Sequence, residues 1–550
     1  MGREINEAQI RDLDKKIEGA TEDTIPLKRR RNSLLNISTR VPPEILGRIF
    51  YWRVIPNEDR PYTRGLPKGS HNFRLVCHHW FEVAARAPEL WGYWGNTLEK
   101  WLQFHRRSGA TPVDLVLDGD HTGDSKISFD GPLRDALRER VKLDAIRSIY
   151  LRSQRKPLLD SIRSALTPDG EGVRRSSIEL ISSQHVDVSA FLIHHHFPKL
   201  RYLHLATKFQ SPPWEHLGQH TTALTNLSIS LNGKASSPTM TQLLSILASN
   251  PRLQILALSK WAIPRDRGDG SAVPVPLRYL ERLSIDANIR PVFRLLPRLE
   301  FPERMDEMNL TVSGCTVEDV LGTLGPCLCD HIQRDGRFRD GLGVFVESSY
   351  LSITIEVSTV KDVGEVPQRL KFATLTAIMR EDIPLLDEDQ MCVYLVAHTP
   401  VEHVVYFEGD LGMDAIRRAI PTMPNIRDLT LISPVLQDGF LQPDPEEPFA
   451  GEKFLPSLQR LFLKNVVLED DHWQPLLRYL SHQTSNGRQW FRLSISEGYE
   501  HICKDVLKEM ERLTEELDLD ISLDEYCPFD SCPISEEDDD EWQERRRGAR

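Results

Sequence analysis

A pattern of three apolar positions, apolar-x-x-apolar-x-apolar, recurs along most of the chain and constrains the fold more than any other feature. It occurs ten times, as IRSIYL (146–151), LRYLHL (200–205), LTNLSI (224–229), LQILAL (253–258), LERLSI (280–285), MDEMNL (305–310), VEHVVY (401–406), IRDLTL (426–431), LQRLFL (458–463) and WFRLSI (490–495). From 200 to 305 the motif starts are 24, 29, 27 and 25 residues apart. The last apolar positions alternate with polar ones, so each motif predicts a short strand with one buried face.

Helical sequences lie between these motifs. Examples are TMTQLLSILASN (239–250), MDAIRRAI (413–420) and WQPLLRYLSH (473–482). Proline precedes several motifs, in FPKL, NPRL, LPSL and MPNI, where it ends a helix before the next strand begins. A helix followed by a strand, repeated along the chain, predicts an α/β solenoid in which each repeat packs on its neighbours.

The period and the motif resemble those of leucine-rich repeats. The array departs from that family's pattern, because the asparagine that follows the strand is present only at Asn232 and Asn288. The pattern also breaks between 311 and 400, where GLGVFVESSYLSITIEV (341–357) indicates longer strands. The sequence therefore predicts an irregular array of repeats with an interruption.

Composition narrows the class of protein. The chain has 550 residues, enough for several domains or for one long array. Its formal net charge of -13 argues against a general nucleic-acid binder. No run approaches about eighteen consecutive apolar residues, the start MGREINEAQI is too polar for a signal peptide, and the eight scattered cysteines are typical of reduced thiols. We therefore expect an intracellular protein, cytoplasmic, nuclear or both, with no membrane or nucleic-acid partner.

Two segments near the start predict a small helical domain. In VPPEILGRIFYW (41–52), two prolines suit the first turn of a helix, and the apolar residues that follow form one stripe on its surface. In FRLVCHHWFEVAARAPELW (73–91), a second helix breaks at Pro88 and an aromatic anchor, Trp91, follows it. So much apolar surface in two short segments needs a core or a partner to cover it.

These two segments together resemble the F-box, most closely the F-box-like domains of fungal proteins that continue into irregular leucine-rich repeats. Val41 stands where leucine is usual, and the loop 53–72 is longer than in the compact F-box. The resemblance implies an adaptor-binding surface made of Pro42, Ile45, Leu46, Ile49, Phe50, Val76, Cys77, Trp80, Leu90 and Trp91. Of these, we expect Trp80, Leu90 and Trp91 to serve mostly in internal packing.

The resemblance also implies a function and a domain organisation. F-box proteins are substrate receptors of Skp–cullin–RING ubiquitin ligases: the box binds the Skp adaptor, and the distal repeats hold a target protein. We expect a helical segment (1–37), an F-box-like domain (38–95), an irregular leucine-rich-repeat solenoid (96–525) and an acidic, disordered tail (526–550). Seven acidic residues of that tail lie between Glu536 and Glu544.

The sequence predicts no catalytic residue, cofactor or metal site. It contains no G-x-S-x-G, P-loop or H-E-x-x-H motif. The run His194-His195-His196 is not expected to bind metal, because adjacent helical side chains point in different directions whereas a helical zinc pair is spaced i, i+4. Two alternatives to the receptor stay open: a leucine-rich-repeat scaffold whose F-box-like segment only caps the array, and a hydrolase or metalloenzyme without local motifs.

Overall fold

The computed structural model forms two compact units. The first comprises Met1–Ala287 with Arg294–Pro302, and the second comprises Asn288–Phe293 with Glu303–Arg550. The residues that the structure describes are 9, 11–17, 27–28, 30–31, 41–54, 78–91, 93–94, 111–118, 146–152, 174–184, 188–207, 212–232, 237–264, 266, 274–315, 332, 334–335, 342–349, 352–361, 368–379, 404–410, 423–432, 457–464, 491–496, 508, 512 and 519–523.

The first unit begins with helices and continues into a parallel sheet of eight strands. The helices are α3 (Pro43–Val54), α4 (His78–Arg86) and the 3-10 helix η3 (Pro88–Trp91). The strands are β1 (Tyr93–Trp94), β2 (Val113–Asp118), β3 (Ile146–Arg152), β5 (Leu180–Gln184), β7 (Tyr202–Thr207), β8 (Asn226–Leu231), β9 (Ile255–Lys260) and β11 (Arg282–Asn288). Each of these strands pairs in parallel with the next one in this order.

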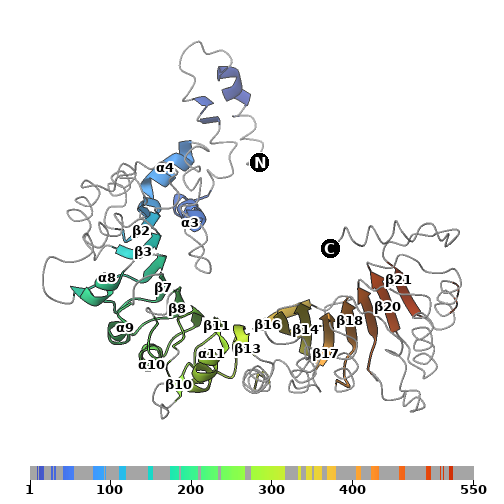
Figure 1. Ribbon diagram of the computed structural model, residues 1–550. Coiled ribbons are helices and arrows are strands. Elements are labelled where there is room, and N and C mark those ends of the chain that lie inside the picture. The colour runs from blue at the N-terminus through green and yellow to red at the C-terminus, as the bar shows by residue number, and fades with distance from the viewer. Residues whose placement is uncertain are drawn as a thin grey trace, which may run out of the picture. The chain divides into compact units, whose positions relative to one another are not determined.

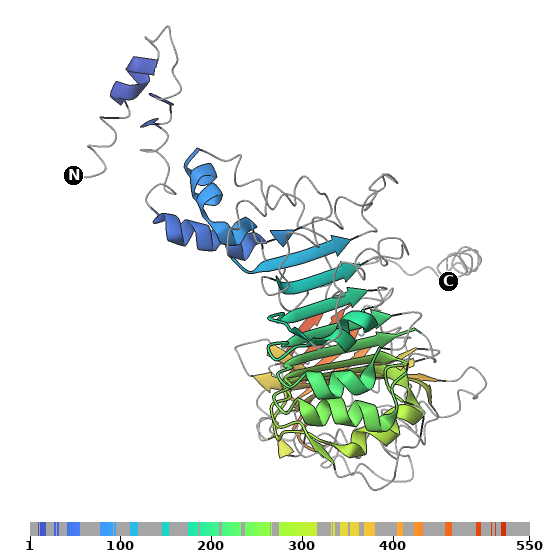
Figure 2. The same cartoon turned by 90° about the vertical axis from the view of Figure 1, so that its left-hand side faces the viewer.

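Helices in the connections lie along one face of this sheet (Figures 1 and 2). They are α8 (Ser189–His194), α9 (Trp214–His220) and α10 (Met240–Ser249). After β11 the chain forms α11 (Ile289–Leu295), most of which belongs to the second unit, and then η6 (Leu296–Arg298). Two short parallel pairs, β4 (Arg174–Arg175) with β6 (His195–His196) and β10 (Val275–Pro276) with β12 (Leu299–Glu300), lie outside the main sheet. The described part of this unit is thus an open α/β arrangement with a parallel sheet.

Alternation along the strands explains the core. In β8, Leu227, Ile229 and Leu231 are buried, while the residues between them are half-buried. Leu227 and Ile229 lie in register with leucines of both β7 and β9, so one apolar face runs from strand to strand. The helix α10 adds its own buried stripe, Leu243, Ile246 and Leu247. The other face carries mainly small or polar side chains.

The proline motifs form tight turns in front of the strands. The N–H of Leu200 donates to the carbonyl of Phe197 at 3.2 Å, and the N–H of Leu253 donates to that of Asn250 at 3.1 Å. Leu280 makes the same bond to Leu277, without a proline, at 3.0 Å. Proline suits the second position of such a turn because its φ is already close to the required value. Both ends of each turn are buried, and the two central residues are exposed.

Asn250 satisfies main-chain groups inside the core. It is buried, its Oδ1 accepts from the N–H of Leu224 at 2.9 Å, and its Nδ2 donates to the carbonyl of Ile246 at 2.8 Å. This side chain links the end of α10 to the turn before β8. The expected repeat asparagine Asn232 is exposed instead, and its Oδ1 accepts from Lys260 Nζ at 2.7 Å.

Neighbouring strands from β5 to β11 are also joined through one carbonyl in front of the earlier strand of each pair. The N–H groups of Thr225 and Asn226 donate to the carbonyl of Arg201 at 2.8 and 2.9 Å. Gln254 and Ile255 donate in the same way to the carbonyl of Thr225, at 2.7 and 2.9 Å. The contact fixes the register between successive strands before their ladders begin.

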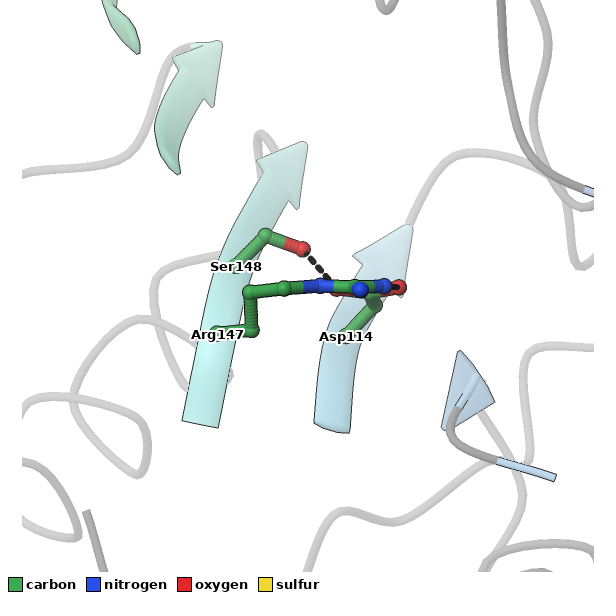
Figure 3. A network of polar contacts seen from close by, with 3 residues as sticks. All are labelled: Asp114, Arg147 and Ser148. Carbon is green, nitrogen blue, oxygen red and sulfur yellow. Dashed lines mark hydrogen bonds and ion pairs between the residues drawn. The ribbon is translucent and has the colours of Figure 1, made fainter. Parts of the chain in front are cut away.

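A polar cluster links β2 and β3 (Figure 3). Arg147 donates from Nε to Asp114 Oδ1 at 3.0 Å and from a terminal nitrogen to Oδ2 at 2.5 Å, and Ser148 Oγ donates to Oδ1 at 2.5 Å. Both donors reach one carboxylate because the register shifts between Val113 and Asp114, which leaves Arg147 as an extra residue in β3. Such a bulge redirects a side chain.

The second unit contains a mixed sheet of nine described strands. They are β13 (Glu307–Cys315), β14 (Leu342–Ser349), β15 (Ser352–Lys361), β16 (Gln368–Met379), β17 (Val404–Asp410), β18 (Asp428–Ile432), β19 (Arg460–Lys464), β20 (Phe491–Ser496) and β21 (Leu519–Leu523). β15 pairs antiparallel with β14 and β16, and every other pair is parallel. The sequence prediction of longer strands at 341–357 is confirmed, because this segment forms most of the β14–β15 hairpin.

Charged side chains tie neighbouring strands of the second unit. Arg460 donates to both oxygens of the buried Asp428, which lies directly opposite it in register. Glu408 is buried as well; its carboxylate accepts from Tyr406 Oη at 2.6 Å and from Lys464 Nζ at 3.0 Å. These buried carboxylates are therefore paired, as a buried charge requires.

Each of the ten sequence motifs leads into a strand, so the strand predictions are confirmed. The strands begin one to three residues after the first apolar position, except at β3, which begins with it. The predicted helix at 239–250 is confirmed as α10, with Thr239 and Gln242 forming a reciprocal capping box. The helices expected at 413–420 and 473–482 lie outside the described residues.

Replacing Asn250 by alanine should destabilise the first unit by about 2 to 4 kcal/mol, because the buried N–H of Leu224 loses its acceptor. Urea unfolding measures this. The matched control, Asn232→Ala, removes an exposed amide and should change the free energy of unfolding by less than about 0.5 kcal/mol. Equal losses in the two variants would contradict the role assigned to Asn250.

His204 should make the stability depend on pH. Burial lowers the pKa of His204 from 6.5 to about 4, and its Nδ1 lies 2.8 Å from Ser228 Oγ. At acidic pH the unfolded chain then binds a proton on His204 that the folded protein does not bind. The stability that depends on neutral His204 is therefore fully present above pH 6.5 and is lost as the pH falls toward 4. The whole loss should be about 3 kcal/mol. In urea unfolding, His204→Asn should have a flatter pH dependence than the wild type; parallel curves would contradict this.

Candidate protein-docking site

The helix α3 begins where its prolines predict. The N–H of Leu46 donates to the carbonyl of Pro42 at 3.0 Å, which closes the first turn. Neither Pro42 nor Pro43 needs an N–H at this position, and Glu44 stands where the helix dipole favours a carboxylate. The start of the helix therefore fixes which of its residues face α4 and η3.

The helix α4 packs on α3 through aromatic residues. The rings of Phe50 and Trp80 lie with their centroids 4.9 Å apart and their planes tilted by 57°. Trp91 is fully buried, and its Nε1 donates to the carbonyl of Ala84 at 2.8 Å. This bond holds η3 against α4, so that Leu90 and Trp91 complete a small core. We call α3, α4 and η3 together the helical module.

The apolar stripe of α3 divides into a buried and an exposed half. Leu46 and Phe50 are buried, with 2% and 3% of their surface exposed. Ile45 and Ile49 are exposed by 47% and 53%, one helical step of about 100° away. Packing within the described residues thus uses only half of the stripe. The pair Ile45 and Ile49 is left as an apolar surface at helical spacing.

A third exposed apolar side chain lies on α4. Phe81 is exposed by 41%, because the buried face of this helix is formed by Val83 and Ala84. Among the described residues, three of the four large apolar side chains that are exposed belong to the helical module. Single exposed apolar residues are common, but their concentration in one small module makes this module a candidate for docking another protein.

A groove with both polar and apolar lining lies between α3 and α4. It has a volume of about 800 Å³ and is lined by Glu44, Gly47 and Arg48 of α3 and by His79, Glu82 and Arg86 of α4, among others. A side chain at Gly47 would reach Ala87 only at an ordinary contact distance of 3.7 Å. The lining carries both carboxylates and guanidinium groups, so it does not select one sign of charge.

The structure describes eight of the ten residues that we expect to bind the adaptor. Leu46, Phe50, Leu90 and Trp91 lie inside the module, and Trp80 is half-buried against Phe50. Val76 and Cys77 lie outside the described residues. Pro42, Ile45 and Ile49 are exposed and remain available for a partner. Phe81 was not among the residues expected to bind a partner. Its exposure became visible only when the structure showed that Val83 and Ala84 form the buried face of α4.

The histidine run is divided among different surroundings. His195 is buried with its ring 4.6 Å from that of Phe191, whereas His196 lies 5.5 Å from His220. His216 and His220, spaced i, i+4 on α9, stack at 5.8 Å; burial and these neighbouring imidazoles lower the pKa of His220. The described part of the chain holds no group of three or more His, Cys, Asp or Glu side chains arranged to bind a metal ion.

Comparison of the sequence with protein-family models and with the curated proteins gives no match. Within the described residues, no helix combines the length and the apolar character that a membrane span needs. Function is therefore inferred from the helical module and the sheets.

Two substitutions on α3 test which half of its apolar stripe is buried. Leu46→Ala should destabilise the protein by about 2 to 4 kcal/mol, because it leaves a cavity in the core of the module. Ile49→Ala should change the free energy of unfolding by less than about 1 kcal/mol, since its side chain is already half exposed. Urea unfolding of the two variants compares them directly. A larger loss for Ile49→Ala than for Leu46→Ala would contradict the assignment of faces.

Proposed function

We propose that this protein is the substrate-receptor subunit of a Skp–cullin–RING ubiquitin ligase, and that its helical module docks on the Skp adaptor. The observation that carries the proposal is the division of the α3 stripe, with Leu46 and Phe50 in the core and Ile45 and Ile49 exposed. A helix that served only as packing would not need an apolar residue at all four positions. The order Pro-Pro-Glu-Ile-Leu, then Trp, then Pro-x-Leu-Trp supports the same reading.

The exposed isoleucines suit a stable interface. Fully burying an isoleucine side chain contributes about 1.5 to 3 kcal/mol, and a half-exposed one has a large share of this still to gain. Ile45 and Ile49 are one helical turn apart, so one partner surface can cover both. The core formed by Phe50, Trp80 and Trp91 holds this helix rigid, which lowers the entropy lost on binding.

We further propose that the sheets belong to an irregular leucine-rich-repeat solenoid. In the first unit, the order of the strands in the sheet follows their order in the chain, as stacking of consecutive repeats requires. The repeated turns and the shared carbonyl contacts support the same fold. The target protein would bind along this array.

The receptor performs no chemistry in this proposal. It holds the target near the ubiquitin carrier that the cullin–RING part of the complex recruits, and so raises the target's effective concentration. The residues of this chain need only bind two proteins at once. No cofactor and no metal ion is required of it.

One observation favours a second candidate, a leucine-rich-repeat scaffold whose helical module is a cap. The module ends at Trp91, and β1 begins at Tyr93 and pairs directly with β2. The module is therefore continuous with the first strands, as the cap of a repeat array would be. Adaptor binding separates the two candidates, because a cap has no need of it.

The double variant Ile45→Asp/Ile49→Asp tests the receptor proposal. In titration calorimetry with a purified fungal Skp adaptor, the wild type should bind and this variant should bind at least about a hundredfold more weakly, since two interface anchors become charged. Both positions are exposed, so the melting temperature should change little. Tyr279→Asp, which alters an exposed aromatic residue outside the module, should bind like the wild type. No binding by the wild type would leave the scaffold as the function.

A further inference from the structure

The turns in front of the strands of the first unit gather positive charge. We define the turn edge as residues 177–180, 197–202, 221–226, 250–255 and 277–282, which precede and begin β5, β7, β8, β9 and β11. It carries two acidic residues, Glu179 and Glu281, and five basic ones: Lys199, Arg201, Arg252, Arg278 and Arg282. This edge is therefore locally positive in a protein whose net charge is -13.

The hydrogen bonds of the turns explain why these cations face solvent. The three turns that such a bond closes, 197–200, 250–253 and 277–280, each bury their first and last residues and expose the two between them. Lys199, Arg252 and Arg278 occupy these central positions, and Arg201 follows one of the turns. Their backbone is fixed by the bonds that close the turns, so the charges are held on a rigid support.

Four of the cations are exposed and have no partner within the described ranges. Among the residues that the structure describes, Lys199, Arg201, Arg252 and Arg278 are exposed and their side chains have no ion-pair or hydrogen-bond partner. The neighbouring Glu281 instead accepts a hydrogen bond from Gln254 Nε2 at 3.2 Å. Within the described part of the chain, these four side chains are therefore available to pair with carboxylates of a partner.

The register sets the spacing of the charges. The motifs align Leu200, Leu224, Leu253 and Leu280, so Lys199 and Arg252 occupy equivalent positions two strands apart, and Tyr279 occupies the next such position. With about 4.8 Å between strands, the row from β7 to β11 spans about 14 Å, which an extended peptide covers in about four residues. Tyr279, exposed by 62%, adds an aromatic contact of the kind enriched in protein interfaces.

We propose that the turn edge binds an extended acidic segment of a protein, with its carboxylates paired to Lys199, Arg201, Arg252 and Arg278. This proposal rests on the proposed receptor function, because the acidic segment would then belong to the target protein. A nucleic acid would offer the same sign of charge, but the acidic character of the whole chain opposes a long polyanion and favours a short segment.

Peptide binding tests the proposal on the full-length protein. Fluorescence polarisation would use a labelled hexaglutamate peptide, a hexaglutamine peptide as the uncharged control, and a single-stranded DNA oligomer of similar length. The triple variant Lys199→Glu/Arg252→Glu/Arg278→Glu reverses three exposed charges. The matched control, Lys15→Glu/Lys28→Glu/Arg290→Glu, makes the same change of net charge at exposed positions outside the turn edge.

The wild type and the matched control should bind hexaglutamate, and the triple variant should bind at least about tenfold more weakly, because like charges then face each other. Added salt should weaken binding, since the cations are exposed. Equal affinity of the triple variant and the wild type, or no binding by the wild type, would overturn the proposal, as would tighter binding of the DNA oligomer. Skp adaptor binding by the triple variant should match the wild type, so failure of the receptor function shows separately.

Discussion

In the first unit, the main-chain carbonyl in front of each of β5, β7, β8 and β9 accepts hydrogen bonds from two consecutive N–H groups at the start of the next strand. The carbonyl of Arg201 accepts from the N–H groups of Thr225 and Asn226. The carbonyl of Thr225 accepts from those of Gln254 and Ile255. The contact needs no particular side chain, so it tolerates a divergent sequence. It holds successive strands in register, and a slip by one residue would turn the buried leucines to the opposite face.

The register of the strands also determines where the exposed residues of the turns lie. Because the strands align, their turns align as well, and the exposed central residues of the turns form one edge. Cations as far apart in the sequence as Lys199 and Arg278 come to lie along that edge. The helical module is held differently, by the contact between the rings of Phe50 and Trp80 and by the hydrogen bond from Trp91 to the carbonyl of Ala84, rather than by a strand ladder. The protein therefore offers two chemically distinct surfaces, one apolar on α3 and one positive on the turn edge.

Much of the fold could be predicted from the sequence, because alternation of apolar residues reports directly on a half-buried strand. The pattern failed at β5, where the buried Ser183 stands in the place of an apolar residue. Asn250 was not predicted either, because its partners, Leu224 and Ile246, come together only when α10 packs beside the turn before β8. In the site, the stripe on α3 was visible, but the helical period cannot tell which half of a broad stripe is covered. That division depends on where Phe50 meets Trp80, which is a tertiary contact.

Hydrogen–deuterium exchange of the full-length protein, with and without the Skp adaptor, tests the central claim most directly. If the exposed face of α3 docks on the adaptor, the amides of Pro43–Val54 and His78–Arg86 should exchange more slowly in the complex, while those of β7, β8 and β9 should be unchanged. Unchanged exchange in α3 at saturating adaptor, or protection confined to the sheets, would contradict the account.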